Sequence, residues 1–156
     1  MREDLLADIC EMSDDKESYL NQDKTFNYIA SVKPNQTLSV DSLDKYRDFL
    51  YNTTRLQQNN GRFEGFKASG KVGFIEDEKL QNNLMDLYQE NIPQLLSSSD
   101  TYIQRKNEWF DFLIKNSGNV TDSTTNLQTI LLTDEAQNLC GFLANTSEII
   151  NRYNVV

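Results

Sequence analysis

Apolar positions three and four residues apart run through the first part of the chain. They form a stripe in which two positions carry charged side chains: Leu5, Ile9, Met12, Lys16, Tyr19, Asp23, Phe26 and Ala30. This spacing is typical of an α-helix with one buried face. Pro34 cannot continue such a helix, because proline lacks the backbone N–H. The pattern predicts a first helix over roughly residues 2–33.

A second helical pattern begins at Ser39, whose hydroxyl can accept a hydrogen bond from a free amide at a helix N-terminus. Leu38 and Leu43 stand where a hydrophobic staple places its two apolar side chains. The inward face of this helix is predicted to carry Leu43, Tyr46, Leu50 and Thr53.

The middle of the chain contains a short pattern and then a long one. A short helical turn is predicted near residues 62–69 and ends at Gly70, since glycine tolerates the left-handed conformation after a helix. A long helix is predicted over residues 77–116. Pro93 is expected to bend it rather than end it, because the apolar stripe continues on both sides. The positions of this stripe are Leu80, Leu84, Leu87, Tyr88, Asn91, Leu95, Tyr102, Lys106, Trp109 and Leu113.

The C-terminal part is predicted to contain a loop and a last helix. Residues 120–126 consist of Val, Thr, Asp, Ser and Asn without a core pattern, and so predict a loop. The last helix is expected to start at Thr133 or Asp134 and to bury Ala136, Leu139, Cys140, Leu143, Ser147 and Ile150. Long amphipathic stretches and few strand signals predict an all-α fold. We expect a single domain over residues 1–156, an elongated antiparallel helical bundle with about four main helices.

Composition narrows the function classes. The chain has 156 residues, 38% of them hydrophobic, which allows one domain with a modest core. A net charge of -9 repels nucleic acid, so no nucleic-acid partner is expected. The absence of histidine excludes His-dependent triads and the common zinc sites, and no cofactor or metal is expected. Cys10 and Cys140 lie on predicted apolar faces, where filling of the core is favoured over a disulfide.

Residues 65–72 nearly match a phosphate-binding loop of the form Gly-x4-Gly-Lys-Ser/Thr. Val72 lacks the hydroxyl that such a loop uses, and no apolar strand precedes Gly65. A glycine turn is therefore the favoured interpretation, and nucleotide binding is the alternative. The candidate residues for contact with a ligand or partner are Lys67, Ser69, Gly70 and Lys71.

Two further groups of residues have a structural and a functional interpretation. The acidic runs at residues 14–15, 76–78 and 134–135 are expected to be solvated faces and helix starts rather than metal sites. An aromatic cluster is expected to form core rather than line a ligand groove: Tyr102, Trp109, Phe110 and Phe112.

Residues 62–75, followed by Asp77, Leu80, Leu84, Leu87 and Tyr88, resemble a segment of an uncharacterised bacterial family of small single-span membrane proteins. Residues 2–9 are similar to the stretch that follows the N-terminal membrane helix of that family. The first helical pattern is also in phase from Arg2 without a capping residue, which predicts a start upstream. The resemblance implies a periplasmic helical domain, anchored in the inner membrane by a helix that precedes Met1, and it transfers no catalytic residue.

Two function classes remain. The favoured hypothesis is a non-enzymatic interaction or sensing module that receives a protein partner or a small ligand outside the cytoplasmic membrane. A homodimer is expected to cover apolar surface that one chain leaves open. Membrane contact is expected only through the missing N-terminal helix. The alternative is an enzyme or nucleotide-binding protein that uses the degenerate Gly-x4-Gly-Lys segment.

Overall fold

The computed structural model describes residues 2–33, 36–58, 60–116 and 123–155. Helix makes up 83% of the chain, and the described residues contain no strand, which confirms the all-α fold. The elements in chain order are α1 (Arg2–Ser31), α2 (Val40–Tyr51), α3 (Gly61–Ala68), the 3-10 turn η1 (Lys71–Phe74), α4 (Glu78–Asp86), the π-helical segment η2 (Leu87–Asn91), α5 (Ile92–Asn116), α6 (Ser123–Leu131), α7 (Asp134–Leu143) and α8 (Ser147–Val155). Within these ranges, no helix combines the length and apolar composition that crossing a membrane requires.

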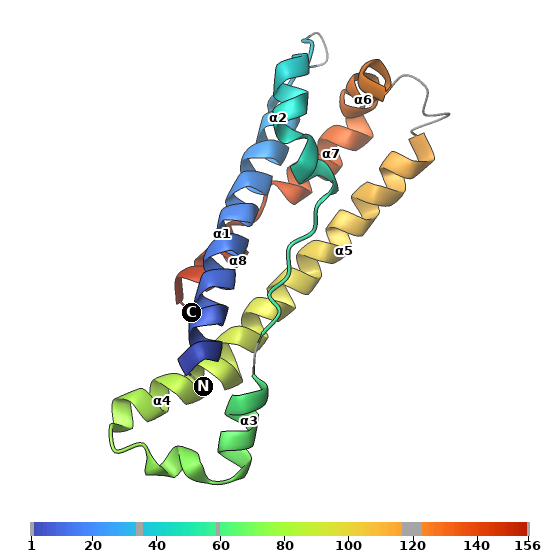
Figure 1. Cartoon of the computed structure of the whole chain (residues 1–156). Helices are drawn as coiled ribbons and strands as arrows, with labels where there is room; N and C mark the ends of the chain where they lie inside the picture. The colour runs from blue at the N-terminus through green and yellow to red at the C-terminus, as the bar shows by residue number, and fades with distance from the viewer. Residues whose placement is uncertain (1, 34–35, 59, 117–122, 156) are drawn as a thin grey trace.

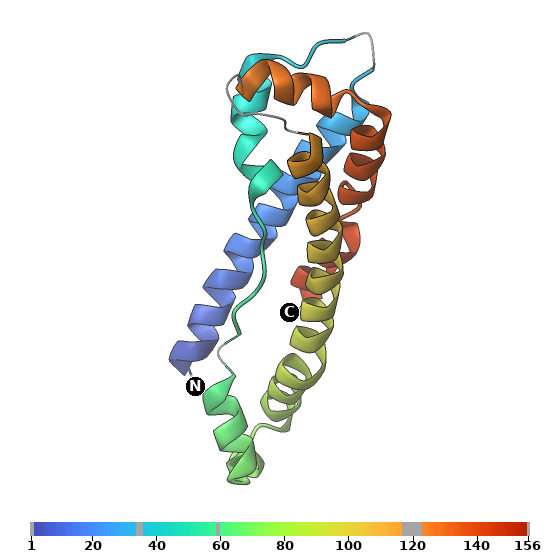
Figure 2. The ribbon, with the colours of Figure 1, turned by 90° about the vertical axis from the view of Figure 1, so that its right-hand side faces the viewer.

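The long helices run alternately in opposite directions along one long axis, and α6 lies across one end of it (Figures 1 and 2). α1 leads to α2 and an extended segment that run back, α5 follows the direction of α1, and α7 with α8 returns. α1 packs against α2, α7 and α8, and α5 packs against α7 and α8. This arrangement confirms the elongated antiparallel bundle.

Local sequence signals explain the starts of α2, α4 and α7. Ser39 caps α2 by accepting a hydrogen bond from the Ser42 amide, as predicted, and Thr133 caps α7 by accepting one from the Ala136 amide. Asp77 accepts a hydrogen bond from the Leu80 amide at the start of α4. These side chains satisfy amides that a helix leaves without partners in its first turn.

The predicted long helix is continuous but changes direction near Pro93. Helical residues run from Glu78 to Asn116, and the π-helical segment η2 ends one residue before Ile92 begins α5. Figure 1 shows α4 leaving the axis of α5 at this point. Proline cannot donate the usual backbone hydrogen bond, and π-helical turns accompany such kinks. Pro93 therefore bends the helix without ending it, as predicted.

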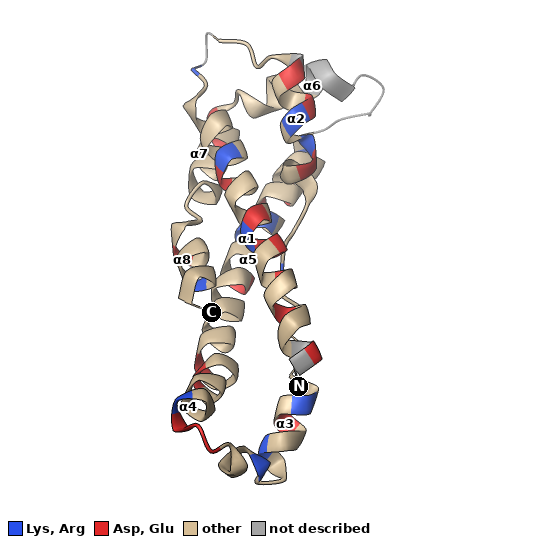
Figure 3. Cartoon of the chain, turned by 60° about the vertical axis from the view of Figure 1, so that its left-hand side comes forward, with Lys and Arg blue, Asp and Glu red and all other residues tan. Residues whose placement is uncertain are grey.

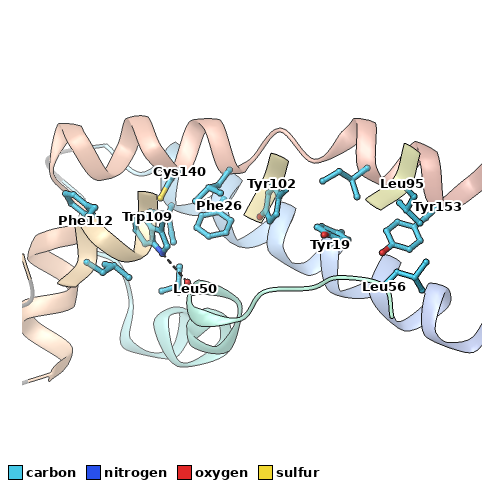
Figure 4. Close-up of a cluster of buried hydrophobic side chains, with 14 of the residues drawn as sticks. Tyr19, Phe26, Leu50, Leu56, Leu95, Tyr102, Trp109, Phe112, Cys140 and Tyr153 are labelled. Carbon is cyan, nitrogen blue, oxygen red and sulfur yellow. Dashed lines mark hydrogen bonds between the residues drawn. The ribbon is translucent and has the colours of Figure 1, made fainter. Parts of the chain in front are cut away.

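Aromatic side chains from α1 and α5 contact one another in the core. Trp109 is fully buried, stands edge-on to Phe26 and stacks on Phe112. Its indole nitrogen donates to the Leu50 carbonyl oxygen at 3.1 Å, which ties α5 to the end of α2 (Figure 4). The prediction that the aromatic cluster forms core is confirmed for Trp109 and Phe112.

An extended segment of residues 52–58 connects α2 to the far end of the bundle. Tyr19 donates from its hydroxyl to the Thr54 carbonyl oxygen at 2.6 Å, and Leu56 is buried. The inward position predicted for Thr53 is wrong, because α2 ends at Tyr51 and Thr53 is exposed while Thr54 is buried.

Two predictions near the start of α1 are wrong. Ile9 is 53% exposed, and Cys10 is exposed and free rather than core filler, whereas Cys140 is buried. Asp8 is buried instead of Ile9, and its carboxylate accepts a hydrogen bond from the Tyr88 hydroxyl at 3.0 Å. Because Asp8 is hydrogen-bonded to Tyr88, Asp8 belongs to the buried face at the start of α1 and Ile9 is left exposed.

The C-terminal region differs from its prediction in two ways. Residues 123–126 begin α6 and do not form a loop. Leu127, Ile130 and Leu131 are buried against the core and stabilise that helix. The rest of the predicted loop, residues 120–122, lies outside the described residues. The last helix is interrupted at residues 144–146, so Ser147 is exposed and starts α8. This interruption lets α8 pack against both α1 and α5.

Candidate functional site

A groove of about 230 Å³ lies between α5 and α8. Its α5 wall is formed by positions three or four residues apart on one helix face, and its other wall by α8 and the residue two positions before it. The lining residues are Gln94, Ser97, Ser98, Thr101, Tyr102, Arg105, Asn145, Glu148, Ile149 and Arg152. We call this hollow the polar groove.

Arg152 is held in place across the polar groove. Its guanidinium donates to the Gln94 side-chain oxygen at 2.7 Å and to Glu148 Oε1 at 3.0 Å. Glu148 also accepts a hydrogen bond from the Ser98 hydroxyl at 3.4 Å. Arg152 Nε is buried and has no hydrogen-bond partner among the described residues. Two of the three guanidinium nitrogens therefore donate to other side chains of the protein, and the third, Nε, has no described acceptor.

Arg105 lies on the opposite wall, on α5, and has no such partner. It is partly buried, and it makes no hydrogen bond or ion pair with any described residue. The lining of the polar groove thus contains two guanidinium groups and one carboxylate, although the whole chain carries a net charge of -9. This local excess of positive charge would attract an anion.

Tyr102 connects the polar groove to the core. It is 1% exposed, its ring stands edge-on to that of Tyr19, and its hydroxyl has no hydrogen-bond partner among the described residues. Burial, followed by Tyr19 and Asp23, raises the pKa of Tyr102 well above its ordinary value. The hydroxyl therefore keeps its proton and remains a donor. A buried polar group without a partner is costly.

Further donors surround these groups. Asn145 accepts a hydrogen bond from the Ser147 hydroxyl with its side-chain oxygen, which leaves its amide nitrogen for a ligand. Ser97 contributes another hydroxyl to the lining. The arrangement presents donors from two guanidiniums, an amide and hydroxyls, and this donor set matches a carboxylate or phosphate oxygen.

The four residues that the sequence singled out lie elsewhere. Lys67, Ser69, Gly70 and Lys71 are exposed around the turn between α3 and η1, and none of them lines the polar groove. Gly70 has φ of 72°, which confirms the predicted left-handed turn. The element before this turn is helix α3 rather than the strand of a phosphate-binding loop. The structure thus brings the four residues together as a surface turn.

The charged residues around that turn are of both signs. Figure 3 shows basic residues on α3 and acidic residues just before α4, at the same end of the molecule. In the part of the chain that the structure describes, no group of three or more Cys, Asp or Glu side chains is placed to hold a metal ion. The acidic run before α4 instead includes Asp77, the cap of that helix.

Sequence reasoning missed Arg105 and Arg152. Both lie on polar helix faces, which normally face solvent, and the polar groove exists only because α8 packs beside α5 as a separate helix. The interruption at residues 144–146 carried no sequence signal strong enough to predict that helix. Of the residues that line the polar groove, Tyr102 is the one that the sequence indicates, as a member of the aromatic cluster. The structure places Tyr102 in both the core and the groove lining.

Comparison with known proteins adds no relative: no family model, no curated protein and no solved structure matches this chain.

Proposed function

We propose that this protein is a non-enzymatic ligand-binding and interaction module whose polar groove receives a small anionic ligand with carboxylate or phosphate oxygens. The observation that carries this proposal is Arg105, a partly buried cation without a described partner, on the wall of the groove that Tyr102 also lines. A carboxylate or phosphate oxygen would form charge-assisted hydrogen bonds with this guanidinium.

Binding is favoured over catalysis by the chemistry of the lining. The carboxylate in the groove, Glu148, is already engaged by Arg152 and Ser98, so it is poorly placed to act as a general base. The guanidiniums of Arg105 and Arg152 can only donate hydrogen bonds, and they recognise oxygen atoms. The alternative that uses the Gly-Lys segment is not favoured, because helix α3 stands where a phosphate-binding loop needs a strand.

The proposal is tested by calorimetry and thermal shift with acetate, succinate and inorganic phosphate as probes. A ligand that binds the folded protein raises its melting temperature. Arg105→Gln should weaken binding by about tenfold or more, because a hydrogen bond to a charged group contributes about 1.5–3 kcal/mol. Glu148→Gln should strengthen binding, because it removes the carboxylate of the groove and releases Arg152.

Arg47→Gln is the matched control, since Arg47 is an exposed arginine on α2 and does not line the polar groove. Equal effects of Arg105→Gln and Arg47→Gln would contradict the proposal. So would the failure of all three anions to bind.

The proposal includes an anchored, periplasmic placement, which is supported by the resemblance of residues 62–75 and 2–9 to the single-span family. Fractionation of cells that produce the full gene product measures this placement. Recovery of the whole protein in the cytoplasmic fraction would contradict it.

We also propose self-association through the N-terminal half of α1. Leu6 and Ile9 are 52% and 53% exposed on this helix, which supports a second copy as the group that covers them. Sedimentation velocity over a range of concentrations should show a dimer that Ile9→Asp abolishes. A monomer at every concentration would contradict this part of the proposal.

A further inference from the structure

Two further hollows lie beside the polar groove along the bundle. A hollow of about 270 Å³ shares Gln94, Glu148 and Arg152 with the polar groove. It shares Asn91 and Val155 with a third hollow of about 400 Å³ between the start of α1, the α4–η2 region and the end of α8. Each hollow shares lining residues with the next, so the three lie in a row along α8, and we call this row the path.

The chemistry of the path changes from one end to the other. The third hollow, which we call the leucine hollow, is lined by Leu5, Leu80, Leu84, Leu87 and Val155 together with Asn83, Asp86 and Asn91. Leu80 is 49% exposed and Val155 is 71% exposed, so apolar surface is open there. Guanidinium groups therefore stand at one end of the path and open apolar side chains at the other.

We infer that the path binds a single-chain amphiphile, with an anionic headgroup at Arg105 and an alkyl chain that extends to the leucine hollow. Charge decides the orientation, because the charged group of the leucine hollow is the carboxylate of Asp86, which disfavours an anion at that end. This inference rests on the proposed anion site and adds the class of ligand that would occupy it.

The length of the path sets the length of the chain. Arg105 and Asn91 are separated by 14 residues of helix, which corresponds to about 20 Å at about 1.5 Å per residue. An extended alkyl chain advances about 1.25 Å per carbon–carbon bond, so it needs about 16 carbon atoms to cover this distance. Short acids should therefore contact only the polar groove, and long acids should reach the leucine hollow as well.

The experiment is calorimetry of the whole protein with acetate, octanoate, dodecanoate and hexadecanoate below their micelle concentrations. Once the chain reaches the leucine hollow, each added methylene should tighten binding by up to about fourfold, which corresponds to about 0.8 kcal/mol for a buried methylene. Arg105→Gln should weaken the binding of every acid by a similar factor.

Leu80→Asp and Val155→Asp test the position of the alkyl chain. Leu80 is 49% exposed and Val155 is 71% exposed, so their replacement leaves the core intact. Each variant should abolish the gain from longer chains and leave acetate binding unchanged. Phe142→Asp is the matched control, because Phe142 is 65% exposed on α7 and lines none of the three hollows.

Each outcome separates this inference from the proposed function. Equal affinity for all four acids, with a loss in Arg105→Gln, overturns the amphiphile and leaves the anion site. A gain with chain length that Leu80→Asp and Val155→Asp do not reduce also overturns the amphiphile. A long acid that binds independently of Arg105 overturns both the anion site and the head position, and absence of all binding overturns both as well. Self-association of the free protein that Val155→Asp abolishes would show that a second copy covers the leucine hollow, and would overturn the amphiphile.

Discussion

Replacement of Lys106 by Met should change the pH dependence of stability. Lys106 is completely buried in α5, and its ammonium donates to the carbonyl oxygens of Phe49 at 2.7 Å and Leu50 at 3.3 Å, near the end of α2. It also lies 4.5 Å from the centre of the Phe26 ring. No carboxylate among the described residues forms an ion pair with it. Desolvation lowers the pKa of Lys106 from 10.5 to about 7.

The direction of the effect follows from proton binding. Between a folded pKa of about 7 and an unfolded pKa of about 10.4, the unfolded chain binds a proton that the folded protein does not. The free energy of unfolding therefore rises with pH in this window, by up to about 1.4 kcal/mol per pH unit. From about pH 6 to about pH 9 the contribution of Lys106 amounts to about 3 kcal/mol.

Lys106→Met removes this dependence and leaves the Phe49 carbonyl without its partner, at a cost of about 1–3 kcal/mol. The wild type should be the more stable protein at about pH 9, and the variant should equal or exceed it at about pH 6. Chemical denaturation followed by the fluorescence of Trp109, the single tryptophan, measures both proteins across the pH range.

Other groups titrate in both proteins, so the difference between the two curves isolates Lys106. The neighbouring Cys140 does not titrate in this window, because burial raises its pKa to about 12. Lys115→Met, at an exposed position of the same helix, is the control and should follow the wild-type pH dependence. A difference between wild type and Lys106→Met that stays constant with pH would refute the reasoning. It would mean that the two carbonyl oxygens and the Phe26 ring outweigh desolvation and keep the ammonium charged.

Two further substitutions test local features by chemical denaturation. Gly70→Ala should lower the free energy of unfolding by about 1 kcal/mol or more, because a φ of 72° strains any residue with a side chain. Gly73→Ala, at a glycine outside the left-handed region, should have a smaller effect. Equal losses of stability in the two variants would contradict the explanation. Thr133→Ala should cost about 1 kcal/mol, because it removes the cap that accepts a hydrogen bond from the Ala136 amide. Thr53→Ala, at an exposed position outside any helix, is its control, and an undiminished stability of Thr133→Ala would show that the cap contributes nothing.

The helices could be predicted where periodicity and caps agree. Ser39, Asp77 and Thr133 mark starts that the structure confirms, because a cap acts through amides within one turn and needs no distant residue. The left-handed Gly70 is local in the same sense. The apolar stripe predicts that Ile9 is buried, and this is wrong because Asp8 is buried there instead. The burial of Asp8 depends on its hydrogen bond with Tyr88, a residue far away along the chain.

The candidate site could not be predicted for the same reason. Arg105 faces Asn145 and Glu148 across the polar groove only because α8 is a separate helix that packs on α5. Glycine and lysine motifs are visible along a chain, whereas a groove between two polar helix faces depends on how those faces meet. The Gly-Lys segment was conspicuous in sequence and lies in an exposed turn, while the polar groove carries no motif.

The interruption between α7 and α8 links the core to the polar groove. Thr146 is fully buried in this interruption, and its hydroxyl donates to Asp23 of α1 at 2.8 Å. This hydrogen bond holds the chain at the point where α8 starts. Asp23 interrupts the apolar stripe of α1, and its hydrogen bond fixes the start of α8. α8 in turn supplies Glu148 and Arg152 to the groove. One charged position in a predicted buried stripe thus positions one wall of the polar groove.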